Sequence, residues 1–180
     1  MTRMVLILST LFLLAACNGR QVDNRAEDAV ISREQLEIEA LDTAIRTDLL
    51  KDYEYDGKWH WGPVFIAVAQ RNRFRLENPP PDLITRLSDM PMRVLSIADQ
   101  DTISAAAGVH AVRPGGHFIE KGTHAEGIAR ALRILRWVSP TELEISISRF
   151  GPLQGGGYSM RLVRSGGRWI VVDTFDVEIG

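Results

Sequence analysis

The residues best suited to binding a metal ion are three histidines that recur every seven residues. His110, His117 and His124 lie in a glycine-rich stretch, with Glu120 and Glu126 close by in the sequence. Imidazole and carboxylate groups are common zinc ligands. The spacing matches neither a His-x-x-x-His helix motif nor a cysteine pair. His117 and His124 are candidate zinc ligands by residue type. Because their spacing matches no common metal motif, we favour a polar surface loop and expect no metal and no cofactor.

A second set of residues is suited to acid–base chemistry. In a strand of period two, Asp173 shares a face with Trp169, Val171 and Phe175. A carboxylate on such an apolar wall can acquire a raised pKa and act as an acid or a base. Tyr158, which follows three glycines, is placed to add a hydroxyl to the same pocket. The simpler interpretation puts Asp173 near the sheet end, solvated or bonded to an arginine, and Tyr158 on a half-buried strand.

Two short patterns are candidate binding surfaces. Trp59 and Trp61 are two residues apart, so both project to one face of an extended chain. They could stack on a sugar, contact a partner or anchor the core. Arg71, Arg73 and Arg75 also alternate, which predicts either an anion site or a solvated edge that discourages strand addition.

The first residues have the features of a secretory signal. Arg3 provides a basic start, residues 5–14 are apolar, and Ala15 and Ala16 are the small residues that a signal peptidase accepts. The apolar run is shorter than the roughly 20 residues needed to cross about 30 Å of hydrocarbon. A cleaved signal is therefore favoured over a permanent transmembrane helix.

The tetrapeptide Leu14-Ala15-Ala16-Cys17 resembles the lipobox of bacterial lipoproteins. The resemblance implies cleavage before Cys17 and acyl chains, such as palmitate, on this new N-terminus. Several acyl chains would anchor the protein stably to a membrane. An ordinary secreted protein is the alternative. Asn18 is not the aspartate that resembles an inner-membrane retention signal, so the outer membrane is preferred over the inner one.

Composition predicts one domain behind a polar tether. The 180 residues are 45% hydrophobic and carry a formal net charge of −2, so nucleic acid is not an expected partner. The lone cysteine leaves no disulfide to stabilise the fold. We expect a signal peptide over residues 1–16, a lipidated tether over 17–30 and a single α+β domain over 31–180.

The domain is predicted to begin with a helix. Ser32 stands three residues before Gln35, which is a capping-box pattern, and apolar residues with helical spacing follow over residues 33–51. Asp42 and Asp48 are among the acidic residues that we assign to its solvated side.

Strands are predicted for most of the remaining chain. Residues 64–69 form an apolar run, 93–98 a short strand, and 100–127 the least structured stretch by composition. Four strands separated by glycine- and proline-containing turns then predict an antiparallel meander, over residues 128–138, 141–150, 157–164 and 168–177. The last strand starts Trp-Ile-Val-Val, which predicts that both of its faces are enclosed.

The predicted fold is an N-terminal helix packed on a curved antiparallel sheet that ends in a four-strand meander. This order of elements resembles the cone-shaped domains of the ketosteroid-isomerase-like (nuclear transport factor two) superfamily. The resemblance covers residues 30–178 by element order, and no catalytic motif accompanies it. We therefore expect a lipoprotein of the cell envelope that faces the periplasm and binds an envelope protein or a small apolar ligand without catalysis. Two alternatives remain: a small pocket enzyme that uses Asp173 and Tyr158, and a structural envelope component.

Overall fold

The computed structural model describes residues 31–54, 62–69, 75–101, 118–151 and 154–176. Within these ranges helices and a mostly antiparallel sheet combine, so the α+β class is confirmed. Residues 32–180 belong to one compact unit. None of the helices in the described ranges has both the length and the apolar composition to cross a membrane.

Helix α1 (Arg33–Glu54) is capped as its sequence predicts and is three residues longer than expected. The Ser32 hydroxyl accepts a hydrogen bond from the Gln35 backbone N–H at 3.1 Å, and Arg33 pairs with Glu37 one turn on at 3.2 Å. One side of the helix is buried; its apolar members are Ile38, Ala40, Leu41, Ala44, Ile45 and Leu49. Burial of this stripe, rather than helix propensity, stabilises the helix.

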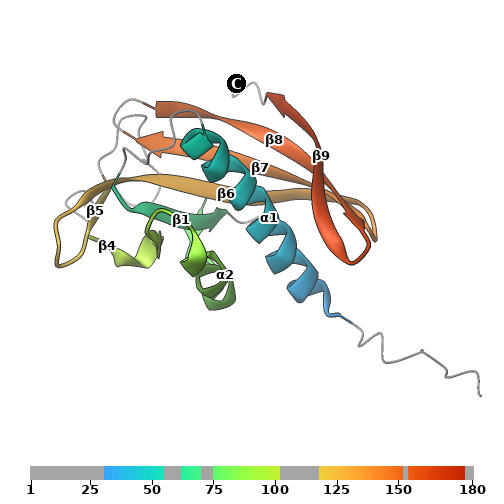
Figure 1. Ribbon diagram of the computed structural model, residues 1–180, viewed down its shortest axis with the longest axis horizontal. Helices are drawn as coiled ribbons and strands as arrows, with labels where there is room; N and C mark the ends of the chain where they lie inside the picture. The colour runs from blue at the N-terminus through green and yellow to red at the C-terminus, as the bar shows by residue number, and fades with distance from the viewer. Residues whose placement is uncertain (1–30, 55–61, 70–74, 102–117, 152–153, 177–180) are drawn as a thin grey trace, which may run out of the picture. The chain divides into compact units, whose positions relative to one another are not determined.

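The sheet has the strand order β2-β1-β6-β7-β8-β9 (Figure 1). These strands span Leu76–Glu77, Val64–Ala69, Glu126–Ser139, Glu142–Gly151, Gln154–Ser165 and Arg168–Asp176, respectively. The last four are joined by consecutive antiparallel hairpins. Glycine supplies the tight turn before β9, where Gly166 and Gly167 have φ values of 57° and 79°.

The expectation of a purely antiparallel sheet is wrong at β1. This strand runs parallel to β6, with Val64 opposite Ile128, and parallel to the short strand β3 (Val94–Ser96). A parallel pair requires a long crossover, and residues 70–125 provide it. A Cβ atom on Gly127 would collide with the Pro63 carbonyl oxygen, so glycine permits this close approach.

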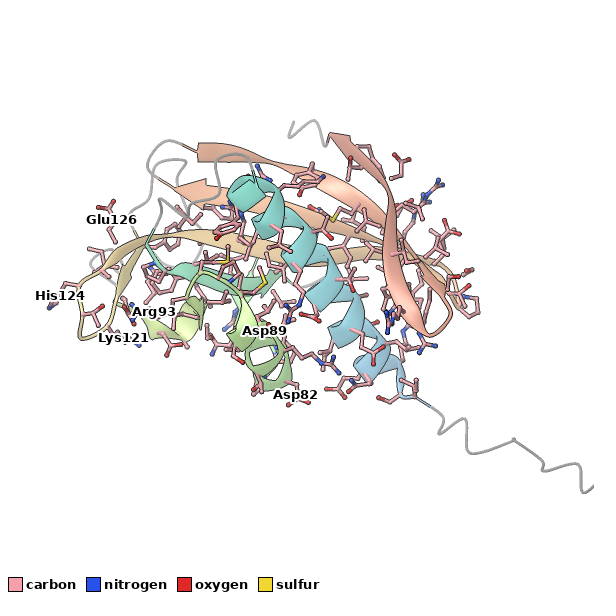
Figure 2. All side chains as sticks on the ribbon, viewed as in Figure 1. Asp82, Asp89, Arg93, Lys121, His124 and Glu126 are labelled. Carbon is pink, nitrogen blue, oxygen red and sulfur yellow. The ribbon has the colours of Figure 1, made fainter. Side chains whose placement is uncertain are left out.

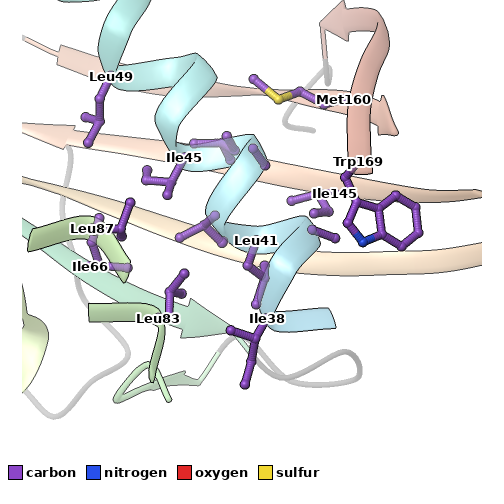
Figure 3. Packing of buried hydrophobic residues seen from close by; sticks show 14 of the residues in the cluster. Ile38, Leu41, Ile45, Leu49, Ile66, Leu83, Leu87, Ile145, Met160 and Trp169 are labelled. Atoms are coloured by element: carbon purple, nitrogen blue, oxygen red, sulfur yellow. The ribbon is translucent and has the colours of Figure 1, made fainter. Parts of the chain in front are cut away.

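Both faces of the sheet are covered near β1 and β6. On one face, α1 and the short helix α2 (Pro81–Arg86) pack against the strands (Figure 3). Leu41, Ile45 and Leu49 of α1 meet Ile66 and Ile145 there. The other face holds a smaller cluster, formed by Phe65, Phe118 and Ala129 with Leu95, Ile97 and Phe150 against it.

The described parts of the stretch 100–127, residues 100–101 and 118–127, contain regular structure that the composition does not predict. Strands β4 (Gln100–Asp101) and β5 (Phe118–Glu120) pair with each other, and β5 forms a hairpin with β6 that carries Lys121 and His124 (Figure 2). A 3₁₀ turn (Ile97–Asp99) precedes β4, and another (Leu87–Asp89) follows α2. Phe118 is buried against Phe65, with ring centroids 6.2 Å apart. This long-range packing outweighs the local glycine content.

Strand β9 contains an irregularity that reverses its faces. Leu162 of β8 lies opposite Val171, but the adjacent Arg161 lies opposite Asp173, so Val172 is an extra residue. Trp169 and Val171 face α1, and after the bulge Thr174 does so because it pairs with buried Met160. The prediction that both faces of this strand are enclosed is wrong, since Ile170 and Val172 are each 50% exposed.

Candidate functional site

Two carboxylates lie on the sheet-facing side of α1, near its C-terminal end. Asp48 and Asp52 are one turn apart and therefore share a face of the helix. Asp48 is completely buried, so its assignment to the solvated side is wrong. It follows Leu41 by seven residues and Ile45 by three, which places it on the buried stripe.

Three polar side chains on neighbouring strands meet these carboxylates. Arg130 of β6 is directly opposite Arg149 of β7, and Tyr158 of β8 is opposite Ile147. Arg130 shares its strand face with buried Ile128 and Leu132, which pack under the helix. Because residues directly opposite each other share a face, Arg149 and Tyr158 also lie on the helix-covered face. Arg130 is as fully buried as Asp48.

Direct contacts join these five side chains, which we call the carboxylate cluster (Asp48, Asp52, Arg130, Arg149 and Tyr158). Arg130 donates from Nε to Asp48 Oδ2 at 2.7 Å and from Nη2 to Asp52 Oδ2 at 2.9 Å. Arg149 donates from Nε and Nη2 to Asp48 Oδ1, at 3.0 and 2.5 Å. The Tyr158 hydroxyl donates to the same oxygen at 2.7 Å. Asp48 therefore accepts bonds on both oxygens, which compensates for its burial.

Electrostatics favour one protonation state for Asp48 and for Tyr158 near neutral pH. Burial acts to raise the pKa of Asp48, but attraction to Arg130 and Arg149 and the bond from Tyr158 outweigh it, so this pKa lies below its ordinary value. Burial and the charge of Asp48 raise the pKa of Tyr158 well above its ordinary value. Asp48 is thus ionised, and the Tyr158 hydroxyl keeps its proton.

An open pocket of about 400 Å³ lies beside the cluster. Its described lining comes from the last turns of α1 and from β7, β8 and β9: Lys51, Arg149, Tyr158, Thr174 and Phe175. Lys51 Nζ is 5.7 Å from the Tyr158 ring centroid, and Arg149 Cζ is 5.1 Å from it. Two cations therefore flank one aromatic ring at the pocket wall.

The structure brings only one of the two predicted acid–base residues to this pocket. Tyr158 lines it, whereas Asp173 lies on the opposite face of the sheet, with its side chain 55% exposed and 4.0 Å from Arg161. The predicted apolar wall around Asp173 is wrong, because the bulge at Val172 shifts the alternation by one residue.

The remaining candidates are not brought together within the described ranges. His124 is exposed in the β5–β6 hairpin, and Arg75 is exposed just before β2. Within those ranges no three metal-ligating side chains gather. The other candidates lie outside the described residues: Cys17, Trp59, Trp61, Arg71, Arg73, His110 and His117.

Sequence reasoning missed Asp48, Asp52, Arg130 and Arg149. The available signal was a charged residue on an apolar face in both partner elements. Arg130 lies on the same strand face as Ile128 and Leu132, and Asp48 lies on the same helix face as Leu41 and Ile45. Opposite charges at such positions indicate a buried ion pair, because an unpaired buried charge is costly.

No known protein family, curated protein or solved structure matches this chain.

Proposed function

We propose that this protein is a lipid-anchored module of the bacterial cell envelope that binds a small ligand without catalysis. Its ligand site is the pocket lined by Lys51, Arg149, Tyr158, Thr174 and Phe175. The volume of about 400 Å³ is in the range of small-molecule sites. The lipobox-like Leu14-Ala15-Ala16-Cys17 supports the anchor, with the domain facing the periplasm and the outer membrane preferred.

The observation that carries the binding role is the protonation state of Tyr158, which lines the pocket, and of Asp48, which accepts its hydrogen bond. A general acid or base works best with a pKa near the operating pH. The pKa of Asp48 is lowered and that of Tyr158 is raised, so both shifts lead away from neutrality. The separation of Asp173 from Tyr158 further weakens the enzyme alternative. These features favour a fixed polar wall that recognises a ligand.

The finer fold relationship is part of the same proposal. A helix followed by the β6–β9 hairpins supports a relation to ketosteroid-isomerase-like domains, in which a helix packs on a curved sheet. In this proposal the protein uses the helix–sheet junction as a binding pocket.

Native mass spectrometry of the full-length protein, gently extracted from its own membrane, tests the proposal. We expect acyl mass on Cys17 and a co-purified small molecule. Thr174→Trp, which narrows the pocket, should remove that molecule, whereas Ile170→Trp on the outer face of the same strand should retain it. A protein complex without any small molecule, or retention by Thr174→Trp, would reject the pocket as the ligand site.

A further inference from the structure

The turns of the β6–β7 and β8–β9 hairpins lie at the end of the sheet where α1 begins (Figure 1). The Arg164 backbone N–H donates to the Thr141 carbonyl oxygen at 2.8 Å, which joins the two turns. Trp137 Nε1 donates to Glu37 Oε1 at 2.9 Å, which places the first turns of α1 against the same end. The structure describes every residue of this part, which we call the hairpin end: residues 32–37, 136–144 and 161–173.

Large apolar side chains are exposed at the hairpin end. Val138 is 48% exposed beside the β6–β7 turn, and Ile170 and Val172 of β9 are each 50% exposed. Ile170 is directly opposite Val163 of β8, so these two side chains share one face of the sheet. Removing such side chains from water is favourable, so the hairpin end is suited to a partner that offers apolar groups.

Two arginines at the hairpin end are left over by its ion pairs. The pairs are Arg33–Glu37, Arg136–Glu144, Arg161–Glu142 and Arg161–Asp173. Within the described ranges, Arg164, Arg168 and Glu34 take part in no ion pair. Arg168 is exposed beside the β8–β9 turn, and Nε of Arg164 is buried without a hydrogen-bond acceptor. Two guanidinium groups, against one carboxylate, are therefore available for an anionic group such as a phosphate.

The attachment point of the tether indicates which partner offers both apolar groups and phosphates. Residues 18–31, which number 14, separate the lipobox cysteine Cys17 from Ser32 at the start of α1. A chain of this length can span at most about 50 Å. A lipid on Cys17 would therefore hold the hairpin end at a high local concentration near the bilayer, because the tether joins the domain at that end.

We infer that the hairpin end docks on the phospholipid bilayer that holds the anchor, with Val138 and Ile170 in the upper acyl region and Arg164 and Arg168 at lipid phosphates. This inference rests on the lipid anchor of the proposed function and adds an orientation to it. Lys51 lines the pocket about 27 Å along α1 from Arg33. The pocket then opens away from the membrane, and its ligand arrives from the aqueous phase rather than from the bilayer.

Quenching by brominated lipids tests the inference. Cys17 is the only cysteine, and its thiol carries the lipid in the proposed mature protein, so an introduced cysteine is the sole thiol for a fluorophore. Val138→Cys and Ile170→Cys label the hairpin end. Lys121→Cys is the matched control, because Lys121 is exposed in the β5–β6 hairpin, at the far end of β6 (Figure 2).

The full-length acylated variants are reconstituted in vesicles of phosphatidylethanolamine and phosphatidylglycerol, with or without bromine on the acyl chains. We expect bromine to quench the labels at positions 138 and 170 several-fold more than the label at position 121. In the Ile170→Cys background, Arg168→Gln should lower the ratio of docked to undocked protein by about fivefold, as for one arginine at an anionic lipid surface. Lys121→Gln should leave this ratio unchanged.

The outcomes separate the docking from the anchor. Equal quenching at the three positions, or no quenching at any of them, would overturn the docking, and an unchanged ratio in Arg168→Gln would overturn the phosphate contact. Labels at 138 and 170 that are shielded from water but not quenched would assign this surface to a protein instead. With acyl mass present on Cys17, each of these results leaves the proposed anchor and pocket standing. Absence of acyl mass would reject the anchor and this orientation together.

Discussion

Two sets of alternating charges lie on opposite faces of the same strands, and burial separates their roles. On the helix-covered face, Arg130 and Asp48 are fully buried. On the open face, Arg136, Glu144, Arg161 and Asp173 form a row across β6, β7, β8 and β9, which we call the outer row. Arg136 makes two hydrogen bonds to Glu144, at 2.7 and 2.8 Å, so its geometry is as good as that of the buried pair.

Similar ion-pair geometry has different energetic consequences at the surface, as in the outer row, and in the core, as in the carboxylate cluster. Exposed pairs typically contribute about 0–1 kcal/mol because water and salt screen them. A buried pair gains little over apolar packing, but loss of one partner strands a charge in a low dielectric. We therefore expect the carboxylate cluster to specify how α1 docks, and the outer row mainly to keep the open face polar.

The largest effect is expected from Arg130→Met. Removing this guanidinium leaves Asp48 buried with only Arg149 and Tyr158, which should lower the free energy of unfolding by about 3–5 kcal/mol. Chemical denaturation of the full-length protein measures the change. Arg136→Met on the same strand is the control and should shift the midpoint far less. Equal shifts in the two variants would show that burial does not separate the two sets.

Low pH should also distinguish the buried carboxylate Asp48 from the carboxylate Glu144 of the outer row. The pKa of Asp48 is lowered in the folded protein, so its contribution to stability is present above its unfolded pKa and is lost as the pH falls toward the folded value. Asp48→Asn should therefore flatten the decline in stability below about pH 5. A hydrogen bond from Arg136 also lowers the pKa of Glu144.

Glu144→Gln is the matched control for this acid-dependent loss. We expect it to change the acid limb of the stability curve less, since Glu144 is near the surface. Denaturation midpoints between pH 7 and pH 3 measure both variants. A steeper acid limb in Asp48→Asn would contradict the sign derived for Asp48.

A smaller effect is expected from Tyr158→Phe. The change removes one donor from Asp48 Oδ1 and should lower the free energy of unfolding by about 1.5–3 kcal/mol, as for a hydrogen bond to a charged group. Tyr53→Phe is the control, because Tyr53 packs at the edge of the same core. Equal losses from the two tyrosines would mean that the hydroxyl of Tyr158 adds no stability.

The smallest effect is expected from Asp173→Asn. Its carboxylate is exposed and 4.0 Å from the Arg161 guanidinium, so we expect neither the denaturation midpoint nor retention of the co-purified small molecule to change. Native mass spectrometry together with a denaturation curve measures both properties. Loss of the co-purified molecule in this variant would connect the open face to the pocket, against the register of β8 and β9.

Local sequence patterns were enough to predict much of the fold. The Ser32 cap and the Leu41–Ile45 spacing predicted α1, and the residues 64–69 predicted β1. The glycine- and proline-containing turns predicted the bounds of the last four strands to within a few residues. These signals are local, because caps, turns and periodicity act over a few neighbouring residues.

The candidate site depended on contacts that no local pattern contains. Asp48 meets Arg130 across 82 positions of sequence, and Tyr158 across 110. Tyr158 was singled out as a pocket residue, but the partner proposed for it was Asp173. Period-two reasoning failed there, because a bulge inserts Val172 and turns the following residues over.

The sequence by itself determined the elements and the α+β class, because hydrophobic period, caps and turn residues are encoded locally. Tertiary structure alone decided that β1 joins β6 in parallel and that the end of α1 lies over Arg130 and Arg149. It also decided that Thr174 rather than Asp173 lines the pocket. The physical reason is that register, bulges and charge pairing are set by the joint packing of distant segments, where burying an unpaired charge costs more than any local preference.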